Sequence, residues 1–282
     1  MQEMSGRVCV VTGSTHGIGQ VTAEALARMG ATVVVHGRNP ERVDEVCRTI
    51  RDRTGNSDVT GIAADFASLA EVRRFAATVA ERHPRVHVLV NNAGAASTTY
   101  RKTADGFEWH FGVNHLAPFL LTNLLLDRIV ASAPARIVVV SSEAHRGNAV
   151  DLDDVNFERG RYRTLAAYGR SKFANILFTV ELARRLEGTG VTANALHPGF
   201  VHTNLGADAT GVMKWIVRAA TLLGLSPEEG AKTSIYLASS PEVATTTGRY
   251  FAKSRVAAPS PAAVDPELAR RLWEKSEALT KP

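Results

Sequence analysis

The feature that most constrains the fold is a regular alternation between short apolar runs and longer amphipathic segments. The runs are rich in valine and isoleucine and lie at residues 8–11, 32–35, 86–90 and 137–140. Short runs that are apolar throughout are typical of strands buried on both faces of a parallel sheet. Segments of helical length separate them, near residues 18–29, 41–52, 69–82, 104–130 and 165–187. Strand and helix in repeated alternation predict an α/β fold with a doubly wound sheet.

The length fits one large domain. At 282 residues, 45% hydrophobic and 22% charged, the chain can bury a full core. We predict a single domain over residues 1–282, in which residues 257–282 form a C-terminal tail with a short helix. Leu272 and Trp273 in this tail favour packing against the body, and binding of a partner is the alternative.

The charge and the segment lengths narrow the partners and the location. A formal charge of +5 is spread over mixed-charge helical segments, so we expect no nucleic-acid partner. No apolar run approaches the roughly 18 residues of a membrane span, and the N-terminus lacks the pattern of a signal peptide. We therefore expect no membrane span and a cytoplasmic protein, with Cys9 and Cys47 as reduced thiols.

A glycine-rich turn follows the first apolar run at residues 12–19. Glycines at such a strand-to-helix turn let the backbone approach a dinucleotide pyrophosphate, which the helix amides then bind. The spacing G-x-x-x-G-x-G differs from the usual fingerprint, and a plain glycine turn is the alternative. The candidate cofactor residues here are Gly13, Ser14, Thr15, Gly17, Ile18 and Gly19.

Arg38 follows the second run, where dinucleotide-binding proteins often carry an acidic residue for a ribose hydroxyl. A guanidinium at this place favours a 2′-phosphate, so we expect NADP(H) to be preferred over NAD(H), unless Arg38 is an ordinary surface residue. Asp65, with Phe66, is a candidate for the adenine site, or else caps the helix that begins near Ser68.

Small and polar residues end the fourth strand at 91–94, where Asn92 and Gly94 are candidates for contact with the cofactor. Another such segment follows the sixth strand, where Pro198 and Gly199 bend the chain and Thr203 is a candidate for the nicotinamide carboxamide. Residues 204–224 have the apolar pattern of a lid over a hydrophobic substrate, or of an ordinary packed helix.

Tyr168 and Lys172 form the central catalytic candidate. At i and i+4 of a predicted helix they share one face. A phenol is a poor base at neutral pH, and a neighbouring ammonium stabilises its charged form. The spacing Y-x-x-x-K alone recurs by chance, so its meaning depends on the residues around it.

Two further polar residues belong to this candidate site. Ser142 ends the fifth strand and is placed to donate to a substrate oxygen, with Ser141 as its rival, because neighbours on a strand point to opposite faces. Asn114 lies in a long apolar helical segment and needs a partner there, for which a water that relays protons to Lys172 is one candidate.

A metal site is not expected. The histidines lie on separate predicted elements without the spacing of a metal motif: His36, His115, His145, His197 and His202.

These motifs, in this order, resemble the short-chain dehydrogenase/reductase family over roughly residues 5 to 252. Val113–Leu116, Ser141–His145 and Leu272–Ser276 look similar to its retinol-dehydrogenase-like branch. The resemblance implies a Rossmann-like sheet of about seven mostly parallel strands with helices on both faces, and pairing of subunits through the two long helices. It also implies a tetrad of Asn114, Ser142, Tyr168 and Lys172, and hydride transfer from a nicotinamide. An additional polar stretch at 151–157 is expected to be a surface excursion near the site.

The leading hypothesis is an NADP(H)-dependent enzyme that interconverts an alcohol and a small, hydrophobic ketone or aldehyde, with Tyr168 as general acid or base. Two alternatives remain: a non-catalytic nucleotide-binding scaffold or sensor, and a sugar epimerase or dehydratase relative.

Overall fold

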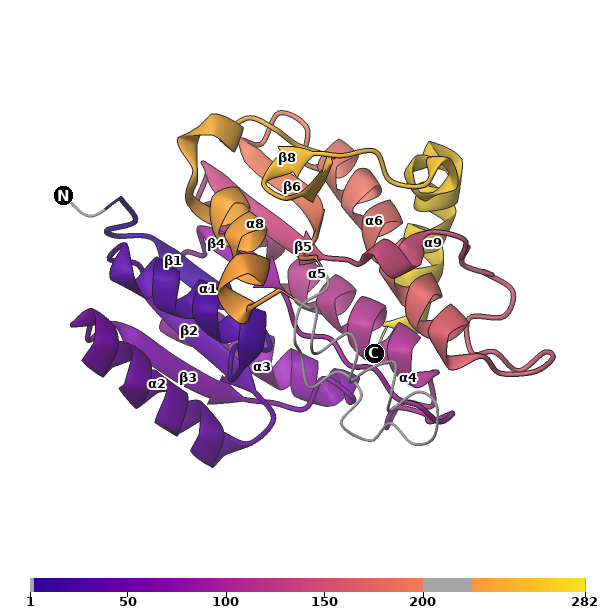
Figure 1. Cartoon of the computed structure of the whole chain (residues 1–282), viewed down its shortest axis with the longest axis horizontal. Coiled ribbons are helices and arrows are strands. Elements are labelled where there is room, and N and C mark those ends of the chain that lie inside the picture. The colour runs from indigo at the N-terminus through magenta and orange to yellow at the C-terminus, as the bar shows by residue number, and fades with distance from the viewer. Residues whose placement is uncertain (1–2, 200–224, 282) are drawn as a thin grey trace.

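In the computed structural model, residues 3–199 and 225–281 are described, and they form one sheet covered by helices on both faces (Figure 1). The sheet has eight strands in the order β3-β2-β1-β4-β5-β6-β7-β8. The strands are β1 (Val8–Val11), β2 (Thr32–Gly37), β3 (Val59–Ala63), β4 (Val88–Asn91), β5 (Ala135–Val140), β6 (Val191–His197), β7 (Tyr250–Ala252) and β8 (Arg255–Val256).

The prediction of a Rossmann-like, mostly parallel sheet is confirmed. The first seven strands pair in parallel, and the two-residue β8 adds an antiparallel edge that the sequence did not indicate. The chain order reverses between β1 and β4, so the carboxyl ends of these strands open a crevice, the place where such folds bind ligands.

The helices are α1 (Gly17–Arg28), α2 (Pro40–Thr54), α3 (Leu69–Arg82), α4 (Trp109–Phe111), α5 (Ala117–Val130), α6 (Thr164–Arg185), α8 (Pro227–Ser239) and α9 (Pro266–Leu279). The helix expected to begin near Ser68 is confirmed, because Ser68 caps α3, and α2 begins at Pro40. No helix within the described ranges is long and apolar enough to cross a membrane.

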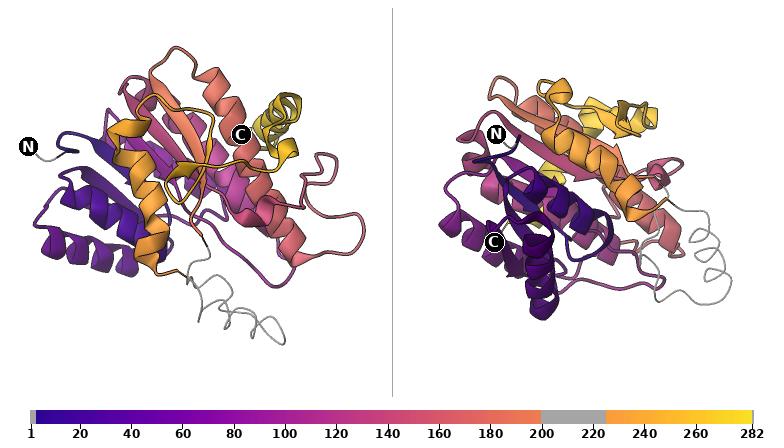
Figure 2. Two further views of the ribbon diagram at one scale, coloured as in Figure 1. Left: turned by 45° about the horizontal axis from the view of Figure 1, so that its top comes forward. Right: turned by 60° about the vertical axis from the view of Figure 1, so that its left-hand side comes forward.

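The alternation of side chains along each strand builds two separate cores. Val10 and Val34 face α3, α5 and α6, whereas Val11 and Val35 face α1, α2 and α8. Figure 2 shows the resulting three layers from two further directions. Helices therefore cover both faces of the sheet.

The segment expected as one helix over 104–130 is divided in the structure. Gly106 has a φ of +85°, and an isolated bridge pairs Lys102 with Glu108, so no helix begins before Trp109. A π-helical turn, Gly112–Leu116, then joins α4 to α5. Such wide turns are frequent at functional sites, and this one carries Asn114.

The C-terminal helix α9 lies against α6 (Figures 1 and 2). The Trp273 ring stacks on Phe178 at 5.8 Å between centroids and meets Phe119 at 4.9 Å. The guanidinium of Arg185 lies 4.2 Å from the centre of the Trp273 ring. The tail is therefore part of the core, as the docking interpretation of Leu272 and Trp273 expects.

Candidate active site

A cavity of about 550 Å³ opens at the carboxyl edge of the sheet. Eleven of the candidate residues line it together: Gly13, Gly17, Ile18, Gly19, Asn92, Gly94, Ser142, Tyr168, Lys172, Pro198 and Gly199. They come from five separate stretches of the sequence, which the parallel sheet brings to one edge. Thr203 and the segment 204–224 lie outside the described residues.

The glycine turn opens α1 toward this cavity. No side chain caps the helix, so the amides of its first turn are available to a ligand from the side of the cavity. Gly13 is required by close packing, because a Cβ there would lie 2.7 Å from the Cα of Ala93. Asn92 ties the two strand ends together by donating to the carbonyls of Thr12 and Gly13 at 2.8 and 3.0 Å.

Ser14 and Thr15 lie behind this turn and do not line the cavity. The backbone N–H of Ser14 donates to the His36 carbonyl, and its hydroxyl donates to the Val11 carbonyl at 2.7 Å. Thr15 packs toward Gly37 at the end of β2. Both residues therefore shape the loop, and their contact with a cofactor stays a prediction.

The three residues expected near the adenosine half of the cofactor differ in their surroundings. Arg38 is exposed directly after β2. Asp65 is exposed and accepts from the backbone N–H of Ala67, so it forms a local turn while Ser68 caps α3. Phe66 is buried against His36, at 4.0 Å between ring centroids, and its place beside an adenine stays a prediction.

Tyr168 and Ser142 lie together in the cavity wall, where the Ser142 hydroxyl is close enough to lower the pKa of the phenol. Ser142 Oγ also accepts from the backbone N–H of Ala144 at 3.2 Å. Ser141 is turned away and donates to the carbonyl of Lys172 at 2.7 Å. The choice of Ser142 over Ser141 therefore agrees with the alternation along the strand.

Lys172 lies beside the phenol, with Nζ 5.7 Å from the centre of the Tyr168 ring and 3.0 Å from the carbonyl oxygen of Val140, to which it donates. Burial lowers the pKa of Lys172 to about 8. Burial also raises the pKa of Tyr168, and the neighbouring Ser142 hydroxyl opposes this only in part. In the protein alone, burial thus favours the neutral forms of both groups.

Asn114 is buried and fully paired. Its Oδ1 accepts from the backbone N–H of Ala95 at 2.7 Å, and its Nδ2 donates to the Ala95 carbonyl and to Ser171 Oγ, both at 3.0 Å. A Cβ on Gly94 would lie 3.3 Å from Lys172 Nζ and 3.4 Å from Asn114 Oδ1. Asn114 therefore fixes the strand end that passes directly over Lys172, and its role in a proton relay stays a prediction.

Several residues of the site were not identified from the sequence. The cavity is also lined by His16, Ala96, Glu143, Ala144, Thr164 and Leu165. His145 supports Ser142 from behind, since its Nδ1 lies 2.7 Å from the Ser142 carbonyl while its Nε2 accepts from the backbone N–H of Ser260 at 3.1 Å. Because a backbone N–H can only donate, the hydrogen of the neutral ring is on Nδ1.

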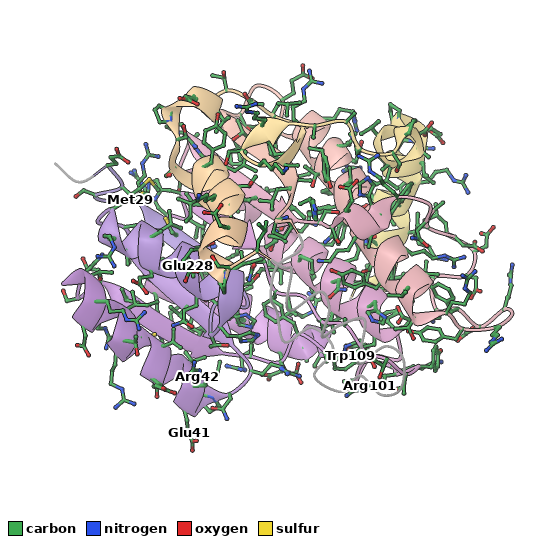
Figure 3. The ribbon with its side chains drawn as sticks, viewed as in Figure 1. Met29, Glu41, Arg42, Arg101, Trp109 and Glu228 are labelled. Atoms are coloured by element: carbon green, nitrogen blue, oxygen red, sulfur yellow. The ribbon has the colours of Figure 1, made fainter. Side chains whose placement is uncertain are left out.

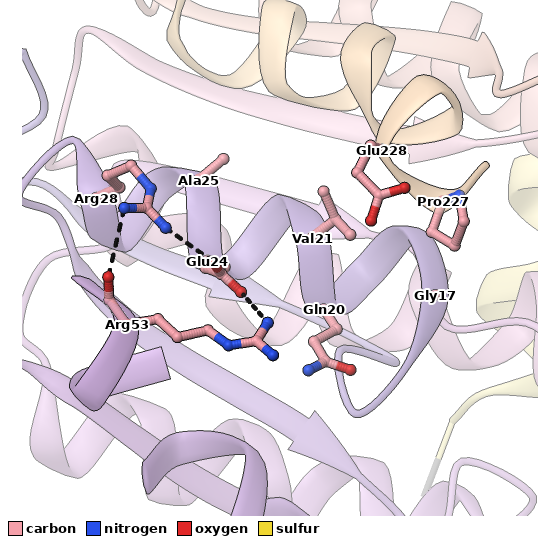
Figure 4. Close-up of a pocket in the computed structure, with 9 residues that line it drawn as sticks. All are labelled: Gly17, Gln20, Val21, Glu24, Ala25, Arg28, Arg53, Pro227 and Glu228. Atoms are coloured by element: carbon pink, nitrogen blue, oxygen red, sulfur yellow. Dashed lines mark hydrogen bonds and ion pairs between the residues drawn. The ribbon is translucent and has the colours of Figure 1, made fainter. Parts of the chain in front are cut away.

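A second cavity of about 380 Å³ lies between α1 and α8 (Figure 4). Its charged side chains bind one another: Glu24 pairs with Arg28 at 2.8 Å and with Arg53 at 3.3 Å. Three of the catalytic candidates, Ser142, Tyr168 and Lys172, line the first cavity, and Asn114 is buried next to it behind Gly94.

Fold and site together define a class of protein: oxidoreductases that bind a dinucleotide at the carboxyl edge of a doubly wound sheet. The family model described as short chain dehydrogenase matches residues 7–211. The chain belongs to the short-chain dehydrogenase/reductase family, in its retinol-dehydrogenase-like branch.

Two of the similar proteins are named retinol dehydrogenases. Human retinol dehydrogenase 13 is 46% identical over 280 residues, which cover 97% of this chain and 84% of the relative. Human retinol dehydrogenase 14 is 44% identical over 292 residues, which cover 98% and 87%. A crystal structure of an uncharacterized Mycobacterium paratuberculosis protein is 36% identical, with a TM-score of 0.80 and coverage of 98% and 94%.

A Beutenbergia cavernae structure, described as an NAD(P)-dependent gluconate 5-dehydrogenase with bound NADP, is 30% identical, with a TM-score of 0.71 and coverage of 89% and 96%. Membership of this family makes the chain an NAD(P)-dependent oxidoreductase acting between alcohols and carbonyls.

Proposed function

We propose that this enzyme uses NADP(H) to interconvert a hydrophobic aldehyde or ketone and its alcohol. The observation that carries the proposal is that Ser142, Tyr168 and buried Lys172 line the wall of one cavity that the glycine turn also lines. A nicotinamide bound at this cavity supplies the hydride.

The protein's part in the reaction is to bind the substrate oxygen and to move one proton. In the direction of reduction, the Ser142 hydroxyl donates a hydrogen bond to the carbonyl oxygen, and the Tyr168 phenol gives that oxygen its proton. In oxidation, Tyr168 takes the proton back. The Lys172 ammonium stabilises the phenolate that forms, an effect that is strong because the site is buried.

A cluster of basic groups supports the choice of NADP(H). Arg42 and Arg38 both lie close enough to lower the pKa of His16, after the larger effect of burial, and His16 lines the cavity. Figure 3 places Arg42 at the start of α2, the helix that Asn39 caps. Guanidinium groups gathered at a helix start favour a doubly charged phosphate, as on the 2′-position of NADP.

The apolar wall beside the phenol supports a hydrophobic substrate. Ala96, Val140 and Leu165 line the cavity together with Tyr168, and Leu165 is 65% exposed. A pocket with apolar walls and a few polar groups favours small apolar ligands held at one polar atom.

The test is to follow NADPH oxidation with a series of medium-chain and aromatic aldehydes and ketones, and to repeat it with NADH. We expect turnover with NADPH at a higher kcat/KM than with NADH. Tyr168→Phe lowers kcat by about 10²–10⁴-fold and leaves the Kd for NADPH unchanged, since it removes the proton donor alone. Tyr236→Phe is the matched control, because it removes a phenol hydroxyl that bonds Glu242 away from the cavity.

The outcomes separate the alternatives. Tight NADPH binding without oxidation by any carbonyl compound would support a non-catalytic scaffold. Equal efficiency with NADH would contradict the phosphate site, and a Tyr168→Phe variant as active as the wild type would contradict the assignment of the proton donor.

A further inference from the structure

A buried pair of ionisable residues lies behind the catalytic tyrosine, and the reaction described above does not use it. Glu108 and His110 are both 0% exposed, and Nδ1 of His110 lies 2.7 Å from Oε1 of Glu108. An ionisable pair is costly to bury unless its remaining hydrogen bonds are satisfied. The hydrogen bonds that the neighbouring groups make to Glu108 and His110 therefore determine the role of this pair.

Glu108 receives donors on both carboxylate oxygens. Its Oε1 accepts from the backbone N–H of His110 at 3.0 Å and from the Tyr162 hydroxyl at 2.8 Å, while Oε2 accepts from the backbone N–H of Phe111 at 2.9 Å. Burial alone would raise the pKa of Glu108, but the bonds from His110 and the two amides outweigh it and leave the pKa below its ordinary value. An ionised carboxylate, which only accepts, fits this set of donors.

The ring of His110 joins this carboxylate to the chain beside the cavity. Its Nε2 accepts from the backbone N–H of Ser97 at 3.0 Å, so the hydrogen of the neutral ring is on Nδ1 and points to Glu108. The ring also meets Tyr168 edge to face, at 6.0 Å between centroids and an interplanar angle of 79°. His110 thus contacts the proton donor and the loop that follows Ala96.

Residues 156–164 pack over the Glu108–His110 pair. The backbone N–H of Glu108 donates to Asn156 Oδ1 at 2.9 Å, and Tyr162 bonds Glu108 from the same stretch. At the start of α6, Thr164 Oγ1 donates to the Thr98 carbonyl at 3.1 Å. Hydrogen bonds therefore join three segments beside the cavity: 97–99, 108–110 and 156–164. The cavity wall next to them is formed by Ala96, Thr164 and Tyr168.

We propose that the buried Glu108–His110 pair, closed by Tyr162, is a positioning element for the reaction: it holds the Tyr168 ring and the substrate-side wall in one arrangement. This inference rests on the proposed function for its kinetic consequence. The pair acts through Tyr168, and its contribution is the placement of the phenol relative to Ser142 and the substrate. A shift of about 1 Å in such a group can cost roughly 10²-fold in rate.

The exposed surface offers a matched control. Lys102, whose backbone is bridged to Glu108, forms an ion pair with Glu158 at 3.2 Å, with side chains 45% and 60% exposed. Arg101 stacks on Trp109 nearby, 4.1 Å from the ring centre (Figure 3). Glu158→Gln loosens the outer contact and leaves the buried pair intact.

The experiment compares His110→Asn, Tyr162→Phe and Glu158→Gln in the full chain with NADP(H) bound. Asparagine keeps a donor toward Glu108 but removes the ring edge from Tyr168, and phenylalanine keeps the Tyr162 ring but removes its hydroxyl. We expect kcat to fall about tenfold or more in His110→Asn and less in Tyr162→Phe, with the Kd for NADPH unchanged in both. Glu158→Gln behaves as the wild type.

A second measurement does not depend on turnover. The Tyr168 phenol carbon is followed by ¹³C NMR against pH, with Ser142 and Lys172 as the other groups that face the phenol among the described residues. A displaced titration of Tyr168 in His110→Asn supports positioning, and a purely structural role would change the melting temperature alone. If the wild type reduces no carbonyl compound, the proposed reaction fails while this titration still tests the pair.

Unchanged kcat and an unmoved Tyr168 titration in Tyr162→Phe and in folded His110→Asn would overturn the inference. If His110→Asn does not fold, Tyr162→Phe, whose ring packing against Tyr100 and Phe157 is retained, decides alone.

Discussion

Replacing Lys172 by methionine is expected to make the protein more stable while removing its activity. Lys172 is 4% exposed, and burial lowers its pKa from the usual 10.5 to about 8. At ~1.36 kcal/mol for each pKa unit, keeping the charged form buried costs about 3.4 kcal/mol. The bond from Nζ to the Val140 carbonyl returns about 1 kcal/mol of this. Methionine, of similar shape and uncharged, then raises the free energy of unfolding at pH 7 by about 2 kcal/mol.

The dependence on pH identifies the cause of this gain. The pKa of Lys172 is lower in the folded than in the unfolded chain, so between pH 8 and 10.5 the unfolded chain binds more protons. The stability of the wild type therefore rises with pH across this window, and the advantage of the variant shrinks toward zero by pH 10.

The assay is denaturant unfolding of both proteins without cofactor at pH 7 and pH 10, together with thermal melting. For a chain of this length, 2 kcal/mol corresponds to roughly 3 °C in Tm. Lys232→Met is the control, because that lysine is exposed and paired with Glu229. A Lys172→Met protein that is less stable at pH 7, or whose gain is the same at pH 10, would refute the reasoning.

Two further outcomes concern groups away from the cavity. Burial raises the pKa of Cys9 to about 12 and that of Cys47 to about 11, so neither thiol should react with a disulfide reagent at pH 8 until the protein unfolds, when both react; rapid labelling of the native protein would contradict this. Trp273→Ala should lower the free energy of unfolding by about 3–5 kcal/mol and Trp273→Phe by less, measured by denaturant titration, because the ring fills the space between Phe119 and Phe178; equal stability of the two variants would argue against this packing.

The buried strands of the parallel sheet could be predicted from the sequence. Valine-rich runs are buried on both faces and their pattern is unambiguous, so β1, β2, β4 and β5 were expected at or near their places. The two-residue β8 has no such pattern, because both of its residues are exposed. Its pairing with β7 comes from a turn through Lys253 and Ser254, which have positive φ values without being glycine.

The part of the candidate site that belongs to short sequence motifs could be predicted. Tyr168, Lys172 and Ser142 follow from strand ends and helical spacing, which the sheet then brings together. Glu108 and His110 gave no signal, since a glutamate and a histidine at the start of a helix are typical of a solvated surface. Only the polar stretch folding back through Asn156 and Tyr162 buries them, and that contact spans about fifty residues of sequence.

The place of α9 has a consequence for self-association. The resemblance to the family implies that two subunits pair through their long helices. In this chain, Trp273 already packs on the surface of α6 around Phe178 and Arg185. The chain thus covers this part of α6 with its own C-terminal helix. Two copies that met at this surface of α6 would first have to detach α9, so an assembly that keeps α9 in place must be built on a different face.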